Sequence, residues 1–391
     1  MILTDDLLQR VDQLPGQLLP LREQLIANLV MLAQIPAPSG EEQQRVRFLL
    51  DRFVEAGLPQ VAADDAGNAV GLLRGRSGHR TILCVAHLDT IVPAAVDHNV
   101  LVQADRVIGP GVSDNALGAA VLAMLPTVLH HLGMELESDL LLLGSVKSMG
   151  RANHEGLRFY LDHTSEEIDY GLVVEGIQLG RLNYFSIGTL RADITCDVRS
   201  NRELAYGSEN ALIALNHIIN RILGIPVPER PFTRITLGRV RAGVSYETEP
   251  DHAELGLEII SHDDELIQQI REQIEDIAAE TSAQHGVDVQ ADFFFARRAC
   301  GLPFSHPLVK TAVEILKKLD LRPDPTHSPS ELSDLLGRGI PSITLGVSRG
   351  EKNLKQTDFV MLEPILKGVA QLVGVLLAID QGFCDEPSAV A

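Results

Sequence analysis

Four short aliphatic runs, separated by helical patterns, constrain the fold of this chain more than any other feature. The runs read TILCVAHLD, DLLLLGSV, YGLVVEG and PSITLGVSRG. Apolar runs bounded by turn residues are typical of strands buried on both faces of a parallel sheet. Between them lie helical stretches such as HEGLRFYLDH and SDNALGAAVLAMLPTVLHHL, the latter with Ser113 or Asp114 placed to cap it. This alternation predicts an α/β domain with helices on both faces of its sheet.

The pattern changes between about Ile187 and Arg298. Here apolar and polar residues alternate as in half-exposed antiparallel strands, in GTLRADITCDV, TRITLGRVRAG, HAELGLEIISH and VDVQADFFFAR. Two helical stretches fall between these strands, which gives the order β-α-β-β-α-β of the ferredoxin-like motif. We therefore expect an α/β domain formed by residues 1–186 and 300–391, with a small α+β domain inserted over residues 187–299.

Net charge and composition exclude several classes of binding partner. The formal net charge of the 391-residue chain is -20, which argues against nucleic acid or an anionic membrane as a partner. The N-terminal residues lack the basic start and apolar core of a signal peptide, and we expect a cytoplasmic protein with no membrane-spanning stretch. The four cysteines show no CxxC spacing, so neither a disulfide framework nor a cysteine zinc site is expected.

Polar residues gather where the predicted parallel strands end. Ligand groups in an open α/β sheet collect at the carboxyl ends of the strands. The residues at these ends, together with one from the loop GPGVSDN, are His87, Asp89, Lys147, Ser148, Glu175 and Asp114. A histidine and two carboxylates suit zinc, so His87, Asp114 and Glu175 form a candidate metal site. Asp89 could orient the His87 imidazole by a hydrogen bond.

Each of these residues also has a simpler interpretation. His87 and Asp89 could be a structural hydrogen-bonded pair, Asp114 a helix cap and Glu175 a solvated loop acid. Only their convergence at one sheet edge favours a metal site over these alternatives.

The order of motifs resembles a known family. The motifs are IPAPSGEE, VAHLDTIVP, GPGVSDNALGAA, VVEG, GSENALIAL, EPDHAEL and GIPSITLG. Together they resemble the co-catalytic di-zinc exopeptidases and amidohydrolases, which include peptidase T, glutamate carboxypeptidase, acetylornithine deacetylase and succinyl-diaminopimelate desuccinylase. The resemblance implies a zinc-exopeptidase-like α/β/α sandwich whose inserted ferredoxin-like domain acts as a lid and dimerisation domain. A homodimer and a small amino-acid or peptide-like ligand in a cleft beside the lid are the partners it implies.

The resemblance also implies which residues bind metal. One zinc would be held by His87, the bridging Asp114 and Glu175, all of which are present. A second zinc would share Asp114 and add a glutamate and a C-terminal histidine. The family's second strand ends in two glutamates, a general base and a zinc ligand. Here Lys147 and Ser148 stand in their place, or Ser148 and Met149 if the match is shifted by one residue. A second zinc is therefore not expected.

Further positions depart from the family pattern. The C-terminal histidine should fall near Leu354 and the lid histidine near Ser200, yet neither region contains one. The glycine-rich substrate loop is replaced by SPSELSD. A positioned base contributes roughly a hundredfold to ten-thousandfold to a hydrolysis, so its loss with a metal should nearly abolish the family reaction.

The leading hypothesis is a protein that has lost or strongly altered hydrolysis and keeps one zinc site. Lys147 could then place a positive charge beside Asp114 in lieu of the second zinc, or it could simply point to solvent. A second hypothesis is an active zinc hydrolase of a peptide or N-acyl amino acid, with His154 or Glu155 as base rather than as the start of a surface helix. A third is a metal-free interaction subunit, in which hydrogen bonds alone hold the candidate ligands.

Overall fold

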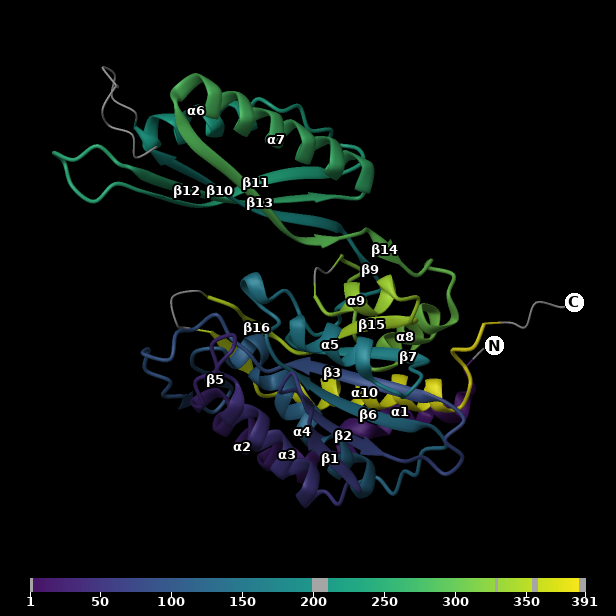
Figure 1. The fold of residues 1–391 in the computed structure, drawn as a ribbon. Helices are drawn as coiled ribbons and strands as arrows, with labels where there is room; N and C mark the ends of the chain where they lie inside the picture. Colours follow the sequence, from purple (N-terminus) through teal and green to yellow (C-terminus); the bar gives the residue numbers. More distant parts are fainter. Residues whose placement is uncertain (1–2, 199–209, 328–329, 354–357, 387–391) are drawn as a thin grey trace, which may run out of the picture. The chain divides into compact units, whose positions relative to one another are not determined.

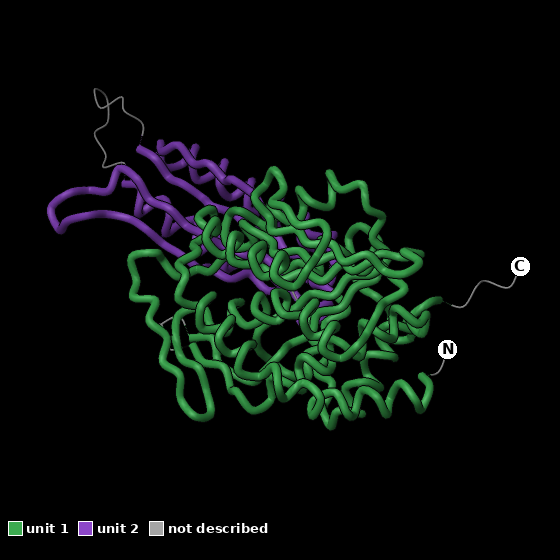
Figure 2. Tube along the Cα trace, turned by 90° about the horizontal axis from the view of Figure 1, so that it is seen from below, with its two compact units in different colours: residues 1–185, 301–391 green, residues 186–300 purple. Residues whose placement is uncertain are grey.

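The chain forms two compact units. The computed structural model describes residues 3–198, 210–327, 330–353 and 358–386. Contacts within the chain divide it into one unit of residues 1–185 and 301–391 and a second unit of residues 186–300, coloured green and purple in Figure 2. The second unit is thus an insertion in the sequence of the first.

A seven-stranded mixed sheet organises the first unit. Its strands lie in the order β1-β2-β6-β3-β7-β15-β8. The four central strands β6, β3, β7 and β15 are mutually parallel, as the four aliphatic runs predict, and almost all their residues are buried. The bounds are β1 Gln60–Ala63, β2 Ala69–Leu73, β3 Thr81–His87, β6 Asp139–Ser145, β7 Tyr170–Ile177, β8 Leu182–Asn183 and β15 Ser342–Ser348.

Helices cover both faces of this sheet. The helices α3, α4 and α10 pack directly on one face, and α1, α2 and α8 pack against them. On the other face lie α5 and α9 (Figure 1), where Leu335 of α9 approaches Gly171 of β7. The arrangement is an α/β/α sandwich with an aliphatic core. The helices are α1 Asp5–Gln17, α2 Arg22–Gln34, α3 Gln43–Glu55, α4 Leu117–His131, α5 Glu155–His163, α8 Pro307–Lys318, α9 Leu332–Gly337 and α10 Ile365–Asp380.

A second, smaller sheet in the first unit brings distant segments together beside the large one. Its strands lie in the order β16-β17-β5-β4, and they are β4 Leu101–Val102, β5 Arg106–Ile108, β16 Gly350–Glu351 and β17 Phe359–Met361. A two-stranded sheet pairs β9, Phe185–Ser186, with β14, Cys300–Gly301. The short helical turns are η1 Leu19–Leu21, η2 Val112–Ala116 and η3 Gly150–Ala152.

The second unit has the predicted ferredoxin-like topology. Its four strands are antiparallel in the order β11-β12-β10-β13, and α6 and α7 bury their apolar faces against the sheet. The exposed face carries ion pairs such as Arg191–Glu258 and Arg239–Asp193. The elements are β10 Gly188–Val198, α6 Ala211–Leu223, β11 Thr233–Ala242, β12 His252–Ser261, α7 Asp264–His285 and β13 Val287–Arg297.

One helical stretch corrects the expectation that no segment could cross a membrane. Among the described residues, the helical stretch Val112–His131 is long enough and apolar enough to cross a membrane. However, 89% of the 18-residue apolar segment within this stretch is buried inside the protein. Such burial is that of a core helix, because α4 packs between the sheet and α2.

Candidate metal centre

The carboxyl ends of β3 and β7 bring His87 and Glu175 to one edge of the sheet. The parallel register pairs Val85 with Val173. His87 and Glu175 each follow two residues later, so their side chains lie on the same face at the same level, since strand side chains alternate with a period of two. Both side chains are buried.

Asp114 joins them from the turn before α4. The sequence allowed Ser113 or Asp114 as the cap of this helix, but neither caps it, and Asn115 accepts a hydrogen bond from the Gly118 N–H instead. Asp114 points into the site, where one ligand atom from each of His87, Asp114 and Glu175 lies within 4.8 Å of the others. The structure therefore brings all three candidate ligands together.

The His87 ring shows which of its nitrogens faces the site. Its Nδ1 lies 3.1 Å from the backbone oxygen of Asp89, which can only accept, so Nδ1 carries a proton. Nε2 lies 3.3 Å from Asp114 Oδ1. If the ring is neutral, His87 Nε2 and Asp114 Oδ1 are both hydrogen-bond acceptors and face one another. Either a second proton or a cation must therefore lie between these two atoms. One nitrogen and two carboxylate donors fit a zinc ion there.

Asp89 is held beside this histidine by contacts to both of its carboxylate oxygens. Its carboxylate accepts hydrogen bonds from the Ser39 hydroxyl and, at 2.8 Å, from the Met149 N–H, and its other oxygen lies 3.5 Å from His87 Nδ1. Asp89 is completely buried. The hydrogen bond to the ring is accepted by the backbone oxygen of Asp89, while the nearer carboxylate oxygen, at 3.5 Å, has no hydrogen-bond partner among the described residues.

Lys147 and Ser148 do not face the candidate ligands. Lys147 forms an ion pair with Glu155 at 2.6 Å, and its N–H donates to Glu42. Ser148 is buried, and its hydroxyl lies 3.3 Å from that of Ser145. The hypothesis that Lys147 neutralises Asp114 is wrong, because the chain turns at Lys147 with a left-handed φ of 54° and the side chain meets the start of α5.

The alternative bases proposed from the sequence are also engaged elsewhere. His154 stands at the N-cap of α5, as expected for a helix start, but it is buried rather than at the surface, and its Nδ1 lies 2.7 Å from Asp334 of α9. Glu155 begins α5 as predicted and is the partner of Lys147. Both side chains are therefore paired with residues outside the candidate metal cluster.

Lys352, which the sequence analysis did not single out, supplies a cation beside Asp114. Its Nζ forms an ion pair with Asp114 Oδ2, the carboxylate oxygen that does not face His87. The side chain reaches this position because Asp358 accepts hydrogen bonds from the Ser113 hydroxyl at 3.0 Å and the Asn353 N–H at 2.7 Å. A weak signal existed in the sequence, since Lys352 lies two residues before the place where the family pattern puts its zinc-ligating histidine.

The charges in the centre shift several pKa values. Burial raises the pKa of Asp114, but His87 and Lys352 outweigh it and hold this pKa below its usual range. Burial lowers the pKa of Lys352, but Asp114 and Glu175 raise it to a value above normal. Burial also raises the pKa of Glu175, and Arg181, whose Nη1 lies 4.0 Å from this carboxylate, only partly offsets that rise. Lys352 is therefore charged at neutral pH.

The described residues contain one cluster that could hold a metal ion. Within the described part of the chain, His87, Asp114 and Glu175 are the one cluster of this kind. On the other side of Asp114 stands an ammonium group, which cannot coordinate a metal. The positions near Leu354 and Ser200, where the family pattern has histidines, lie outside the described residues.

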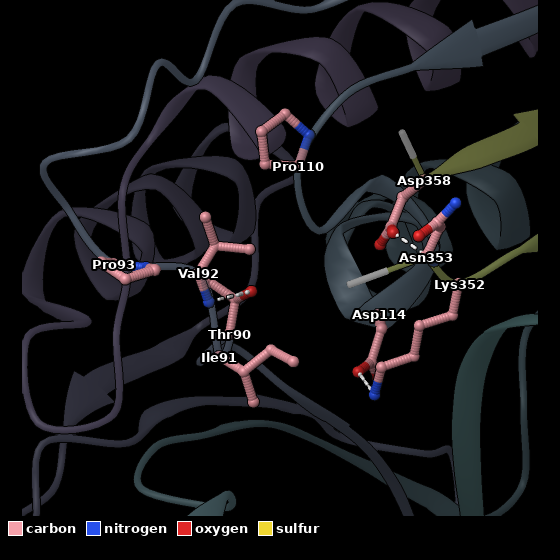
Figure 3. Close-up of a pocket in the computed structure, with 9 residues that line it drawn as sticks. All are labelled: Thr90, Ile91, Val92, Pro93, Pro110, Asp114, Lys352, Asn353 and Asp358. Carbon is pink, nitrogen blue, oxygen red and sulfur yellow. Dashed lines mark hydrogen bonds and ion pairs between the residues drawn. The ribbon is translucent and has the colours of Figure 1, made fainter. Parts of the chain in front are cut away.

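A small pocket opens beside the Asp114–Lys352 pair. It has a volume of about 80 Å³. Figure 3 shows Asp114 and Lys352 pointing toward each other on one wall, with Ile91 and Val92 on the opposite side. The complete lining is Thr90, Ile91, Val92, Pro93, Pro110, Asp114, Lys352, Asn353 and Asp358.

Comparisons with known proteins agree with the resemblance seen in the motifs. No protein-family model matches the chain. A protein named as a LysW-lysine/LysW-ornithine hydrolase, from Thermococcus kodakarensis, is 33% identical over 82 residues, which cover 20% of this chain and only 23% of that relative. The similarity in sequence is therefore confined to a part of each protein.

Solved structures match nearly the whole chain. A tripeptidase from Staphylococcus aureus superposes with a TM-score of 0.75 at 17% identity, covering 92% of this chain and 99% of the tripeptidase. A Bacillus subtilis protein described as a dinuclear metal-binding peptidase of the M20 family superposes with a TM-score of 0.65 at 15% identity, covering 92% and 98%. This protein therefore has the fold of the M20-type metallopeptidases and amidohydrolases that its motifs resemble, an α/β/α sandwich with an inserted ferredoxin-like domain.

Proposed function

We propose that this protein is a single-metal form of the metallopeptidase fold that has lost the family's two-metal hydrolysis. It would hold one zinc ion at His87, Asp114 and Glu175 and bind a small amino-acid or peptide-like ligand. The observation that carries the proposal is the ion pair between Lys352 and Asp114 Oδ2. A zinc ion at this site would act as a Lewis acid toward an oxygen atom of the ligand.

The position of Lys352 supports one metal over two. A carboxylate that bridges two metals offers one oxygen to each. Here Asp114 offers Oδ1 toward His87, while Oδ2 is taken by the ammonium group. One positive charge thus stands where the resemblance implies a doubly charged ion. Lys352 would balance the charge of Asp114 without providing a Lewis acid or a second coordination site.

Among the described residues that follow β6, the side chains considered as a base all contact other partners, which supports the loss of hydrolysis. Ser148 bonds to Ser145, His154 pairs with Asp334, and Glu155 pairs with Lys147. A general base must reach the proton it abstracts, either directly or through one water. None of these residues is free to do so, which makes the hypothesis of His154 or Glu155 as base the weaker one.

The ligand class is proposed from the relatives and the pocket. The relatives are named as a tripeptidase and as a LysW-lysine/LysW-ornithine hydrolase. The pocket beside Lys352 is small, with apolar side chains on one side and charged ones on the other. A ligand that combines a short aliphatic group with a polar or charged group would match both walls.

Metal content per chain tests the proposal directly. Wild-type protein and His87→Ala would be loaded with zinc, freed of excess and measured by elemental analysis, and both would be incubated with a panel of dipeptides and N-acyl amino acids. We expect about one zinc in the wild type, none in His87→Ala, and no zinc-dependent turnover. Two zinc ions per chain, or turnover that disappears in His87→Ala, would overturn the proposal. Absence of zinc from the wild type would favour the metal-free interaction subunit.

A further inference from the structure

One buried side chain ties together the two segments that carry the carboxylate ligands. Asn115 directly follows Asp114 and is completely buried. Its Nδ2 donates to the backbone oxygen of Val174 at 2.8 Å, and its Oδ1 accepts from the Gly118 N–H at 3.2 Å. Val174 directly precedes Glu175 on β7. The amide of Asn115 thus joins the turn before α4 to the strand beside it.

The backbone at Asp114 is not fixed by regular helical geometry. The φ and ψ angles are −146° and 84° at Asp114 and −134° and 42° at Asn115, which lie outside the helical range. The helix α4 begins only at Leu117. On the other side of Asp114, the Ser113 hydroxyl donates to Asp358 at 3.0 Å. The candidate ligand therefore lies between two neighbours whose side chains are anchored to other segments.

The same turn touches β7 closely on both sides of Glu175. A Cβ atom at Gly176 would lie 2.6 Å from the backbone oxygen of Ser113. A Cβ atom at Gly118 would lie 2.6 Å from the backbone oxygen of Val174. Both distances are well below the ordinary van der Waals separation of about 3.5 Å. Glycine at these two positions therefore allows the turn and the strand to approach closely enough for the Asn115 bond.

We propose that Asn115 is a positioning residue of the metal centre, which sets the separation of Asp114 and Glu175 before a metal binds. The inference rests on the proposed single-metal site and adds to it the contact that holds two of its ligands in register. Asn115 carries no charge, so it acts on the site through position alone. Ligands that are already in place need less reorganisation on binding, which favours affinity.

Two variants separate this role from that of a helix cap. Asn115→Ala removes both hydrogen bonds and leaves every charge of the centre in place. Asn115→Ser keeps a hydroxyl that can accept from the Gly118 N–H, as serine does at helix starts, but it is too short to reach Val174. We expect zinc to bind about tenfold more weakly to both variants. The urea midpoint of the metal-free protein should fall in Asn115→Ala and recover in part in Asn115→Ser.

Asn68→Ala is the matched control. Asn68 is also a completely buried asparagine of the first unit, and it accepts from the Val146 N–H at 3.0 Å and donates to the Gly156 oxygen at 2.9 Å. It donates to Asp64 as well. The segments that it joins carry none of the three candidate ligands. We expect its urea midpoint to fall like that of Asn115→Ala and its zinc affinity to stay within about twofold of the wild-type value.

Zinc affinity would be measured by competition with a chromogenic chelator, on the full chain of the wild type and the three variants. Wild-type affinity in both Asn115 variants overturns the positioning role and leaves the single-metal site standing. Recovery of affinity in Asn115→Ser together with stability also overturns it, because Asn115 would then be a helix cap only. An equal loss of affinity in Asn68→Ala overturns it too, since any destabilisation of the first unit would suffice. Absence of zinc binding by the wild type overturns the single-metal site, and the role of Asn115 with it.

Discussion

Replacing Lys352 by methionine tests whether its ammonium group competes with a metal for the charge of Asp114. The substitution keeps most of the length and apolar surface of the side chain and removes its charge. In the native protein the Asp114 side chain is 16% exposed and that of Lys352 is 43% exposed, so water screens their ion pair only in part. Removal of the charge should therefore change both stability and metal binding.

The two effects should have opposite signs. Metal-free Lys352→Met should lose about 1–3 kcal/mol of unfolding free energy, the usual cost of leaving a buried charged acceptor without its partner. A unit charge and a divalent ion 4 Å apart repel by about 2 kcal/mol even with the dielectric constant of water. Zinc should therefore bind about 30-fold more tightly to the variant. Its stoichiometry should stay near one, because no further ligand appears.

Urea unfolding of the metal-free protein and chelator competition would measure these quantities. Lys147→Met is the control, because Lys147 is a similarly exposed lysine whose partner is Glu155. Its zinc affinity should stay within about twofold of the wild-type value. The reasoning is refuted if Lys352→Met binds zinc no more tightly than the wild type, or if Lys147→Met gains as much affinity.

Three other perturbations probe the support of the site and the independence of the units. Asp89→Asn should weaken zinc binding by about 10–100-fold in chelator competition, because it removes a negative charge 3.5 Å from His87 Nδ1; an unchanged affinity would contradict this. Ile274→Ala, in the core of the second unit, should cost about 2–5 kcal/mol and speed proteolysis there, with zinc content retained. His306 accepts a hydrogen bond from the Leu308 N–H at the start of α8, and burial lowers its pKa, which Glu386 only partly offsets. Its contribution to stability is therefore present above about pH 6.5 and is lost as the pH falls further, so His306→Asn should flatten the decline in urea midpoint between about pH 6.5 and 5.

The local sequence pattern was sufficient to predict the architecture. The four aliphatic runs became the central parallel strands, and the alternating segments became the antiparallel sheet of the second unit. A strand buried on both faces gives a continuous apolar run, and a strand buried on one face gives alternating apolar and polar residues. The positions of His87 and Glu175 followed from the same logic, since both lie where a buried parallel strand ends.

The sequence was less informative about the partners of Asp114. Lys147, which follows a strand end directly, was the lysine considered as its partner, with a solvent-facing side chain as the alternative, and Lys352 was not considered. The backbone turn at Lys147 and the nearby Glu155 direct that side chain away. Lys352 reaches Asp114 because Asp358 joins its segment to the turn before α4. Such a bridge between distant segments leaves no periodic signal.

The sequence by itself therefore determined the two folds, the strand ends and the three candidate ligands, because each depends on patterns within a few neighbouring residues. Only the tertiary structure decided that Lys352 is the cation beside Asp114 and that Lys147 pairs with Glu155 instead. The contact between Lys352 and Asp114 joins side chains from elements far apart in the chain. It depends on how the segment after β15 packs against the turn before α4, and no local propensity encodes that packing.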